Sequence, residues 1–399
     1  MLENIRQKLP LLALTGFLFL MSANGWMMHR FDLNISIGIY FSVCILVLIY
    51  RAEFLEYLYE RLQKNIFDID FLILAFLLLH FVVNQEVSIT GISFGFLFIF
   101  FSSLARANPR KNREIISHSL FISAIISSLG VLIGLVEGMI GNSIIFTTIQ
   151  PPNYPSPILK IFNNLFMTNW VYQISGFQLS INYTAYILIG GLASTSFMED
   201  ASKYKNFFIS IFILALILCQ AKIGYLFLSF LGIKVILNSP YKFLILVSCF
   251  YLILTHLTIN HAENVLEITH YFKSQIFSWG SYDFYVSFFS WLKISAFEYL
   301  VSVNWFFGNY DEFIKTISAD PHSFWVSLIL IGGPVTALLM LIKFIKVEKG
   351  YREINSKKSA LLFASFYALI VETIVWDAVD APIFWIIFLT IPMIIPEKN

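Results

Sequence analysis

Residues 205–238, with the sequence KNFFISIFILALILCQAKIGYLFLSFLGIKVILN, decide the topology of the chain. Two apolar runs flank the polar group Gln220-Ala221-Lys222, and the stretch holds 34 residues. A bilayer core about 30 Å thick needs about 20 apolar residues per crossing helix. The stretch is therefore long for one crossing and short for two, and its interpretation fixes the membrane side of every later residue.

The composition of the whole chain repeats this apolar character. Of the 399 residues, 58% are hydrophobic and 13% are charged, whereas soluble domains carry about 25% charged residues. These proportions exclude a soluble enzyme, a nucleic-acid-binding protein and a disordered scaffold, and they predict an all-α polytopic membrane protein. The three cysteines, Cys44, Cys219 and Cys249, lie in apolar runs and predict neither disulfides nor a metal site.

About twelve transmembrane helices are expected in a single integral membrane domain that takes in residues 1–399. Charged residues and Pro, Asn and Gly bound the apolar runs. The runs lie at roughly 9–24, 33–50, 67–84, 89–105, 114–138, 180–198, 205–220, 222–238, 242–258, 322–343, 359–375 and 380–395.

The placement of lysine and arginine supports this count, because short cytoplasmic loops collect basic residues. With twelve crossings and both termini inside, 19 of the 26 basic residues are cytoplasmic and six are external. One crossing over 205–238 would put the basic segment 343–358 outside. We therefore divide this stretch into two crossings.

Two external segments exceed turn length, residues 139–179 and 259–321. Within the larger one, the aromatic-rich stretch 279–303 predicts amphipathic helices that lie on the outer interface. Its aromatic residues suit either an anchoring belt or stacking on sugar and lipid. Loops of this length are frequently functional.

The sharpest local motif is Ser318-Ala319-Asp320-Pro321-His322-Ser323, which opens the crossing at 322–343. Asp320 suits the N-cap, Pro321 the first helical position, and His322 the first turn. A helix N-terminus disfavours imidazolium, so His322 is expected to be neutral and able to act as a general base. The alternative is a polar interfacial residue without chemistry. Gly332-Gly333-Pro334, ten residues further along, predicts a kink or a close helix contact.

Lys222 is the second candidate, since it lies on a predicted hairpin too short to project far from the membrane. An ionisable group at that depth normally faces a polar cavity, and a lysine there suits a phosphate. The alternative is a lysine that reaches the interface without a ligand. Glu372, Lys293 and Lys315 also fall on the external side. The sequence has no zinc spacing, phosphate-binding loop or calcium loop, so neither a metal nor a cofactor is predicted.

A set of motifs near the C-terminal third resembles the O-antigen polymerase and ligase superfamily. It comprises Trp291-Leu292-Lys293, Asn304-Trp305-Phe306-Phe307-Gly308, and Pro321-His322-Ser323 followed by Gly332-Gly333. The family pattern has an Asn-Pro-Leu-Phe-Gly-like turn about fourteen residues before a Pro-His-Asn helix start, and Gly308 to His322 is fourteen. Glu372 resembles the acidic residue of the family's penultimate span. The chain departs from the pattern at Lys222 and Ser287, where many members carry arginine.

The resemblance implies glycan transfer from undecaprenyl diphosphate on the periplasmic face of a bacterial inner membrane, by a metal-independent glycosyltransferase. His322 would be the base, and Lys222 would bind the diphosphate, assisted by Lys293 or Lys315. Glu372 would be part of the substrate-binding set. It also implies a chain-length regulator and a flippase as protein partners, and no nucleic acid.

Two reactions and one other class remain open. A polymerase joins lipid-linked repeat units, whereas a ligase transfers the glycan to lipid A core. The 139–179 segment resembles the second large loop of polymerases and favours that reaction. A polysaccharide transporter or flippase would instead place coupling charges in broken helices near the midplane.

Overall fold

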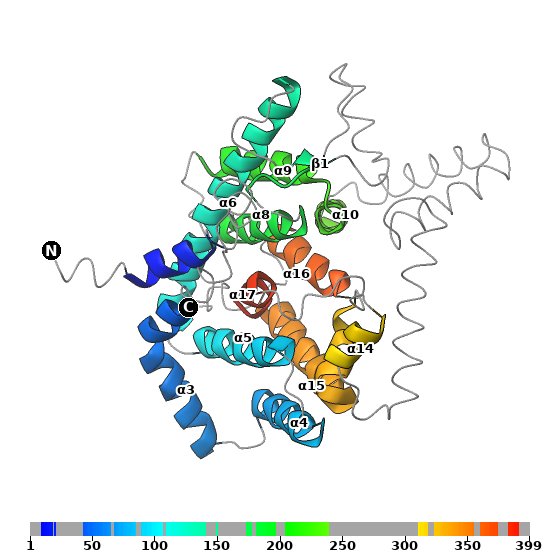
Figure 1. Ribbon diagram of the computed structural model, residues 1–399. Helices are drawn as coiled ribbons and strands as arrows, with labels where there is room; N and C mark the ends of the chain where they lie inside the picture. The colour runs from blue at the N-terminus through cyan, green and yellow to red at the C-terminus, as the bar shows by residue number, and fades with distance from the viewer. Residues whose placement is uncertain are drawn as a thin grey trace.

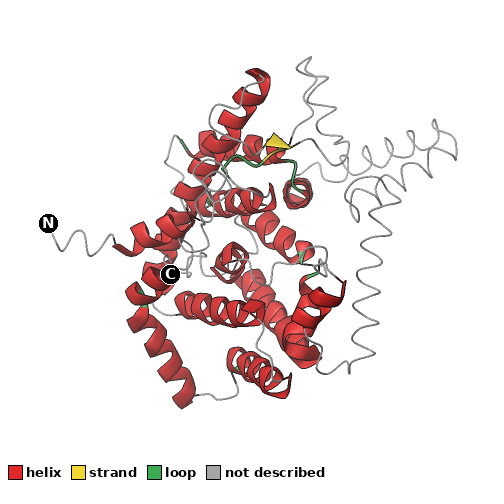
Figure 2. Ribbon diagram, viewed as in Figure 1, coloured by secondary structure: helices red, strands yellow, loops and turns green. Residues whose placement is uncertain are grey.

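The computed structural model describes residues 9–18, 20, 43–64, 68–84, 89–106, 109–140, 149–150, 173–177, 181–196, 204–238, 310–317, 323–354, 360–373 and 382–390. This part of the chain is almost entirely helical (Figure 2). A two-residue antiparallel ladder joins β1 (Ile149–Gln150) to β2 (Gln173–Ile174). The prediction of a helical protein is confirmed, and this ladder inside the 139–179 segment is an addition to it.

The helix bounds agree with most of the predicted runs to within a few residues. Residues 43–49 match only the end of the second run, the run at 242–258 and the interfacial stretch 279–303 lie outside the described residues, and helices α3 and α14 were not predicted. The helices are Leu9–Leu18, 43–49, α3 (Arg51–Lys64), α4 (Ile69–Asn84), α5 (Ile89–Arg106), α6 (Pro109–Ile140), α8 (Ile181–Thr195), α9 (Lys205–Cys219), α10 (Lys222–Asn238), α14 (Tyr310–Ile317), α15 (Phe324–Ile354), α16 (Ala360–Glu372) and α17 (Pro382–Thr390).

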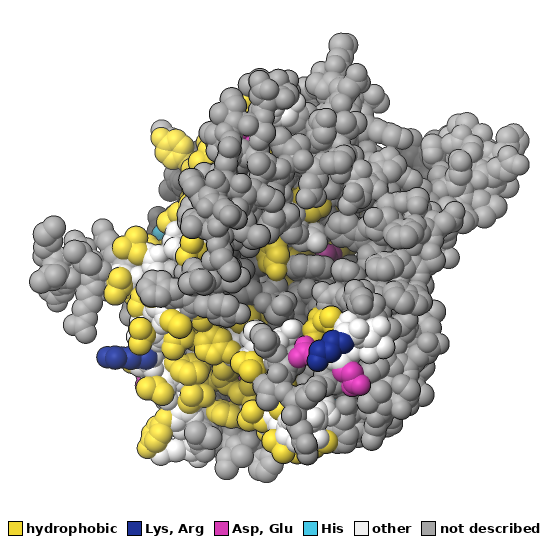
Figure 3. Space-filling view, in the orientation of Figure 1, with side chains coloured by type: hydrophobic (Ala, Val, Ile, Leu, Met, Phe, Trp, Pro, Cys, Tyr) yellow, Lys and Arg dark blue, Asp and Glu magenta, His cyan; other side chains and the backbone are white. Residues whose placement is uncertain are grey.

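Two helices in the described residues are long and apolar enough to cross a membrane, Glu114–Gly138 within α6 and Phe324–Lys349 within α15. Apolar side chains also point outward on several helices. On α6 the exposed residues Ile122, Leu129 and Val136 recur every seven positions, which places them along one side of the helix. A broad hydrophobic area lies over α3 and α5 in Figure 3.

The stretch 205–238 forms two helices, as predicted. Gln220 ends α9 in the left-handed conformation, with φ 55°, and α10 begins at Lys222. A left-handed residue cannot continue a right-handed helix, so the chain changes direction here.

Helix α17 lies in the middle of the bundle, seen end-on in Figure 1, with α5, α8, α15 and α16 around it. Trp385 is fully buried, with its ring 5.6 Å from the rings of both Phe94 and Phe98. Helices α6 and α8 pack so closely that a side chain at Gly191 would overlap Ala124. This aromatic core is the floor beneath the candidate site described below.

Helix α15 reverses direction at Gly333, which has φ 77° and ψ 170°. Phe344 lies 5.8 Å from Phe324 and 5.3 Å from Trp325, measured between ring centroids. In a continuous helix, nineteen positions would separate Trp325 from Phe344 by about 28 Å. We call residues 324–332 the first limb and residues 334–354 the second limb of α15.

This arrangement differs from the prediction of one crossing over 322–343. Gly332-Gly333-Pro334 was expected to kink the helix, and the bend is confirmed but is a reversal. The physical reason is that glycine alone adopts the Gly333 conformation readily, and Pro334 cannot donate the helical hydrogen bond that would keep the limbs in line. The first limb is consequently held beside the second limb, with Phe324, Leu328 and Ile331 buried.

Aspartates at the start of an apolar run, such as Asp68 and Asp70, are typically interfacial, but these two have distinct structural roles. The Asp68 carboxylate accepts a hydrogen bond of 2.9 Å from the backbone N–H of Asp70 and so caps the start of α4. Asp70 is buried and forms an ion pair of 2.7 Å with Lys343 of the second limb. The interfacial interpretation of Asp70 is therefore wrong, because its partner lies 273 residues further along the chain.

Candidate functional site

Glu372 is the one sequence-predicted site residue whose side chain is both described and buried, with 2% of its surface exposed. It is the last residue of α16, and it continues the buried face formed by Leu362, Phe366 and Leu369 at helical spacing. The helix therefore directs this carboxyl into the protein interior. A buried carboxylate is costly unless polar groups surround it.

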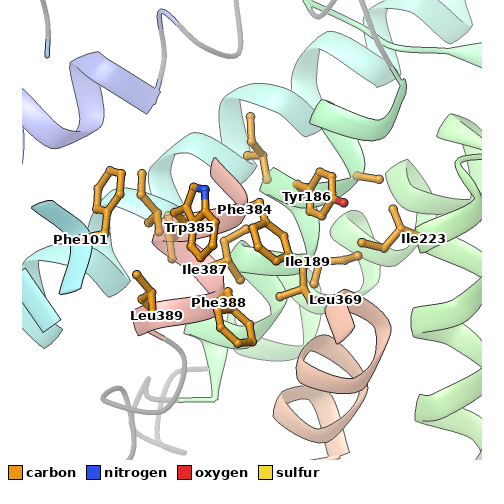
Figure 4. Packing of buried hydrophobic residues seen from close by; sticks show 14 of the residues in the cluster. Phe101, Tyr186, Ile189, Ile223, Leu369, Phe384, Trp385, Ile387, Phe388 and Leu389 are labelled. Atoms are coloured by element: carbon orange, nitrogen blue, oxygen red, sulfur yellow. The ribbon is translucent and has the colours of Figure 1, made fainter. Parts of the chain in front are cut away.

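A phenol of α8, Tyr186, interacts electrostatically with this carboxyl. Tyr183, one turn earlier on the same helix, also acts electrostatically on Tyr186. Tyr186 is fully buried, and the edge of its ring meets Phe384 at 6.4 Å. In Figure 4 its hydroxyl points away from the α17 aromatic side chains, toward Ile223 at the start of α10. The site thus combines the Glu372 carboxyl and the Tyr186 hydroxyl above an apolar floor.

The start of α10 lies at the same end of the bundle as Glu372. The ring of Phe230 is 6.3 Å from Phe363 and 5.9 Å from Tyr367, and the Lys234 ammonium is 5.2 Å from the Phe363 ring. These contacts show that α10 runs antiparallel to α16, so the start of α10 lies near the end of α16. The backbone of Lys222 is therefore at the Glu372 end of this helix pair, while its side chain lies outside the described part of the structure.

The first turn of α15 joins the site through one hydrogen bond. The indole Nε1 of Trp325 donates to the hydroxyl of Thr373 at 3.2 Å, and that hydroxyl donates to the carbonyl of Ile370 at 2.6 Å. Thr373 directly follows Glu372, and Trp325 comes three residues after His322. The described chain on each side of His322 ends at 317 and resumes at 323, so His322 itself lies outside the described residues.

The floor of the site is aromatic. Phe324 lies 5.7 Å from Phe384 and 5.8 Å from Trp385, between ring centroids. Figure 4 shows Trp385, Phe384 and Phe388 between Phe101 on one side and Leu369 on the other. Such a surface excludes water beneath the polar groups, which strengthens their electrostatic interactions.

The other predicted residues are not part of this cluster in the described structure. Lys315 is exposed on α14, beside Asp311 and Glu312, and acidic and basic side chains gather over α14 in Figure 3. Lys293 lies outside the described residues. Of the five candidates, the structure places the backbone of Lys222 at the Glu372 end of the α10–α16 pair. It also places Trp325, three residues after His322, against Thr373 at that end of α16.

Sequence reasoning missed Tyr186, Trp325 and Thr373. The signal for Tyr186 is weak, because one tyrosine in an apolar run is equally suited to simple packing. Trp325 and Thr373 acquire meaning only from the fold, which brings together residues 48 positions apart.

Chemically, the cluster can accept and donate hydrogen bonds to a hydroxyl-rich ligand, and its carboxyl can orient a hydroxyl or stabilise a nearby cation. Among the described residues, no three His, Cys, Asp or Glu side chains gather so that they could hold a metal ion. Comparison of the chain with protein-family models, with curated proteins and with solved structures finds no match.

Proposed function

We propose that this protein polymerises undecaprenyl-diphosphate-linked oligosaccharide repeat units into O-antigen or a related surface polysaccharide, as a multi-pass protein of a bacterial inner membrane. The observation that carries the proposal is the hydrogen bond between Trp325 and Thr373. It connects the helix that follows His322 to Thr373, the residue next to the buried Glu372. The family resemblance assigns His322 and Glu372 to the same reaction, although the two residues are 50 positions apart in the sequence.

The outward-facing apolar side chains support the membrane part of the proposal. Exposed leucine, isoleucine and valine side chains occupy α4, α6, α10 and α15. Soluble monomers rarely expose contiguous apolar patches of this kind. Hydrocarbon contact removes the cost, so we assign these faces to lipid and propose a multi-pass arrangement in which α15 turns back at Gly333, with the larger segments 139–179 and 259–321 on the periplasmic side.

The proposed reaction is a nucleophilic displacement. A hydroxyl of one lipid-linked unit gives its proton to His322 and attacks the anomeric carbon of the other unit. The bond between that carbon and the diphosphate oxygen breaks as the glycosidic bond forms. Lys222 stabilises the leaving diphosphate, and Glu372 with Tyr186 orients the sugar hydroxyls. No cofactor takes part in this scheme.

The direct test uses the purified chain with undecaprenyl-diphosphate-linked repeat unit in detergent. The parent protein is expected to yield products of two or more joined units and free undecaprenyl diphosphate. Glu372→Gln should reduce this yield strongly, whereas Glu348→Gln, which changes a carboxyl bound by the Tyr367 hydroxyl on the opposite side of α16, should not. If the parent joins units only when lipid A core is supplied as acceptor, the ligase reaction is the correct one.

A specific observation also favours the transporter alternative. Helix α15 is broken at Gly333, and a buried ion pair links its second limb to α4. Broken helices and interior charges are features of transport proteins. Detergent separates the two functions, because it leaves no compartments. A polymerase still joins units there, whereas a transporter gives no new product and only moves labelled lipid-linked glycan across a vesicle membrane.

A further inference from the structure

The carboxylate of Asp70 joins three helices. The ammonium of Lys343, on α15, lies 2.7 Å and 3.0 Å from its two oxygens, and the hydroxyl of Tyr57, on α3, donates to it at 3.2 Å. The Lys343 ammonium is also 5.8 Å from the ring of Phe98 on α5. The side chains of Lys343 and Asp70 are 6% and 0% exposed. This is a desolvated pair and not a surface salt bridge.

Such a pair constrains the helices that carry it. Removal of one partner leaves an uncompensated charge in the interior, whereas removal of both does not. The second limb of α15 can therefore occupy its place beside α4 only while both charges are present or both are absent. The ion pair therefore helps to determine where the second limb lies.

Helix α4 holds α15 at a second point, near the turn. A Cβ at Gly91 would lie 2.7 Å from the Phe81 ring and 3.0 Å from Ile331, so α4, α5 and the end of the first limb meet there. Asp70 meets Lys343 at the other end of the same helix pair. Helix α4 is thus antiparallel to the second limb and lies along it from the turn to Lys343.

One aromatic side chain separates the ion pair from the candidate site. Phe344, the residue after Lys343, contacts the rings of Phe324 and Trp325 across the reversal. Trp325 donates its hydrogen bond to Thr373, beside Glu372. A shift of Lys343 therefore moves Phe344, and Phe344 supports the first limb.

We propose that Asp70 and Lys343 are positioning residues, whose buried ion pair holds Phe344 against the first limb of α15 and thereby sets the place of Trp325 beside Thr373. Their ion pair and the Tyr57 hydrogen bond join α4, the second limb of α15 and α3. The effect on glycan polymerisation rests on the proposed function, whereas the effect on the first limb is independent of it.

The experiment measures protection of the first limb in the full-length protein in detergent, with Cys44, Cys219 and Cys249 replaced by alanine. Ser327→Cys is the reporter, because Ser327 is fully buried on that limb. Ser128→Cys on α6, also buried, reports global unfolding. Asp70→Asn and Lys343→Gln are expected to raise maleimide labelling at position 327 at least about tenfold, with position 128 unchanged.

The matched variants make the result decisive. The charge exchange Asp70→Lys with Lys343→Asp should restore protection at 327, and Lys346→Gln, which removes an exposed charge on the same limb, should have no effect. The doubly neutral Asp70→Asn with Lys343→Met should stay folded, with position 128 protected, and should label at 327 less than either single variant, because it leaves no uncompensated charge in the interior. Unchanged labelling at 327 in both single variants, or equal rises at 327 and 128 in every variant, overturns the proposal.

Polymer formation by the same proteins separates the two proposals. If the parent makes polymer, the single variants should lose activity together with protection, and the charge exchange should regain both. If the parent makes none while 327 responds as expected, the proposed function fails and the positioning role stands.

Discussion

The indole of Trp325 donates a hydrogen bond of 3.2 Å to the hydroxyl of Thr373 and so joins the start of α15 to the end of α16 beside Glu372. The indole N–H of Trp325 can only donate a hydrogen bond, and the Thr373 hydroxyl is its acceptor. The hydrogen bond brings together two residues that lie close in the sequence to His322 and Glu372. It also gives the most direct test of the candidate site.

Thr373→Val keeps the shape of the side chain but removes the acceptor and leaves the indole N–H unpaired. We expect a loss of about 1–3 kcal/mol in stability together with a loss of polymer formation. Thr373→Ser keeps the hydroxyl and should behave like the parent in both respects. Melting temperature in detergent and product length on gels measure the two effects. Equal behaviour of the Val and Ser variants would show that the hydroxyl has no such role.

His322→Ala should abolish long-chain polysaccharide and leave the protein inserted in the membrane. A general base typically contributes about 10² to 10⁴ in rate, and a neutral imidazole in the first turn of a helix suits that role. His118→Ala is the control, because His118 is exposed on α6 and contacts the carbonyl of Glu114. Polymer of normal length and amount in His322→Ala cells would leave His322 a structural role only.

Lys222→Arg should retain part of the activity, whereas Lys222→Gln should lose it, because the proposed diphosphate contact needs a positive charge. Lys234→Gln is the control on the same helix, at the end where its ammonium lies over Phe363. The measurement is turnover of purified undecaprenyl-diphosphate-linked repeat unit in nanodiscs, with binding of the unreacted donor followed separately. Normal binding and turnover by the Gln variant would remove Lys222 from the site.

Gly333→Ala should destabilise the protein by about 1–3 kcal/mol, because its backbone conformation is open essentially to glycine alone. Gly232→Ala should instead stabilise the protein. That glycine lies in the helical interior of α10, an added Cβ there meets nothing within 4 Å, and alanine is the better helix former by about 1 kcal/mol. Thermal unfolding of the two variants against the parent checks the pair. A harmless Gly333→Ala would mean that the reversal does not depend on this residue.

Gly350→Cys should resist an impermeant thiol reagent added from outside, and Ser281→Cys should react with it. The reason is the excess of basic residues in the 343–358 segment, which the positive-inside rule assigns to the cytoplasm. Labelling in intact cells, with lysed cells as the positive control, is the measurement. External labelling at position 350 would reverse the proposed topology.

Where local pattern determines structure, the sequence was sufficient. The apolar run 89–105 became α5 (Ile89–Arg106), and Gln220-Ala221-Lys222 did separate two helices. Glu372 was singled out because it falls on the predicted external side and resembles the acidic residue of the family's penultimate span, and its side chain is buried at the end of α16. These features depend on neighbours in the chain, and hydrophobic periodicity reports such neighbours.

Features that depend on distant partners escaped prediction. Gly332-Gly333-Pro334 is compatible with a mild kink, and only the packing of Phe344 against Trp325 makes it a reversal. Asp70 at the start of an apolar run is equally typical of an interface, and its role follows from Lys343, 273 residues away. A single sequence holds no record of which of these pairings the fold uses.

The corner at Gln220 has a consequence for the direction of the chain. A left-handed conformation costs a residue with a side chain about 1–2 kcal/mol, and glycine would adopt it freely. The corner nevertheless holds glutamine, and only 1% of its surface is exposed. Because the side chain is enclosed by the protein, the backbone cannot swing about this point as it could about a glycine. The turn at Gln220 is therefore rigid, and it fixes both the angle between α9 and α10 and the position of the Lys222 backbone.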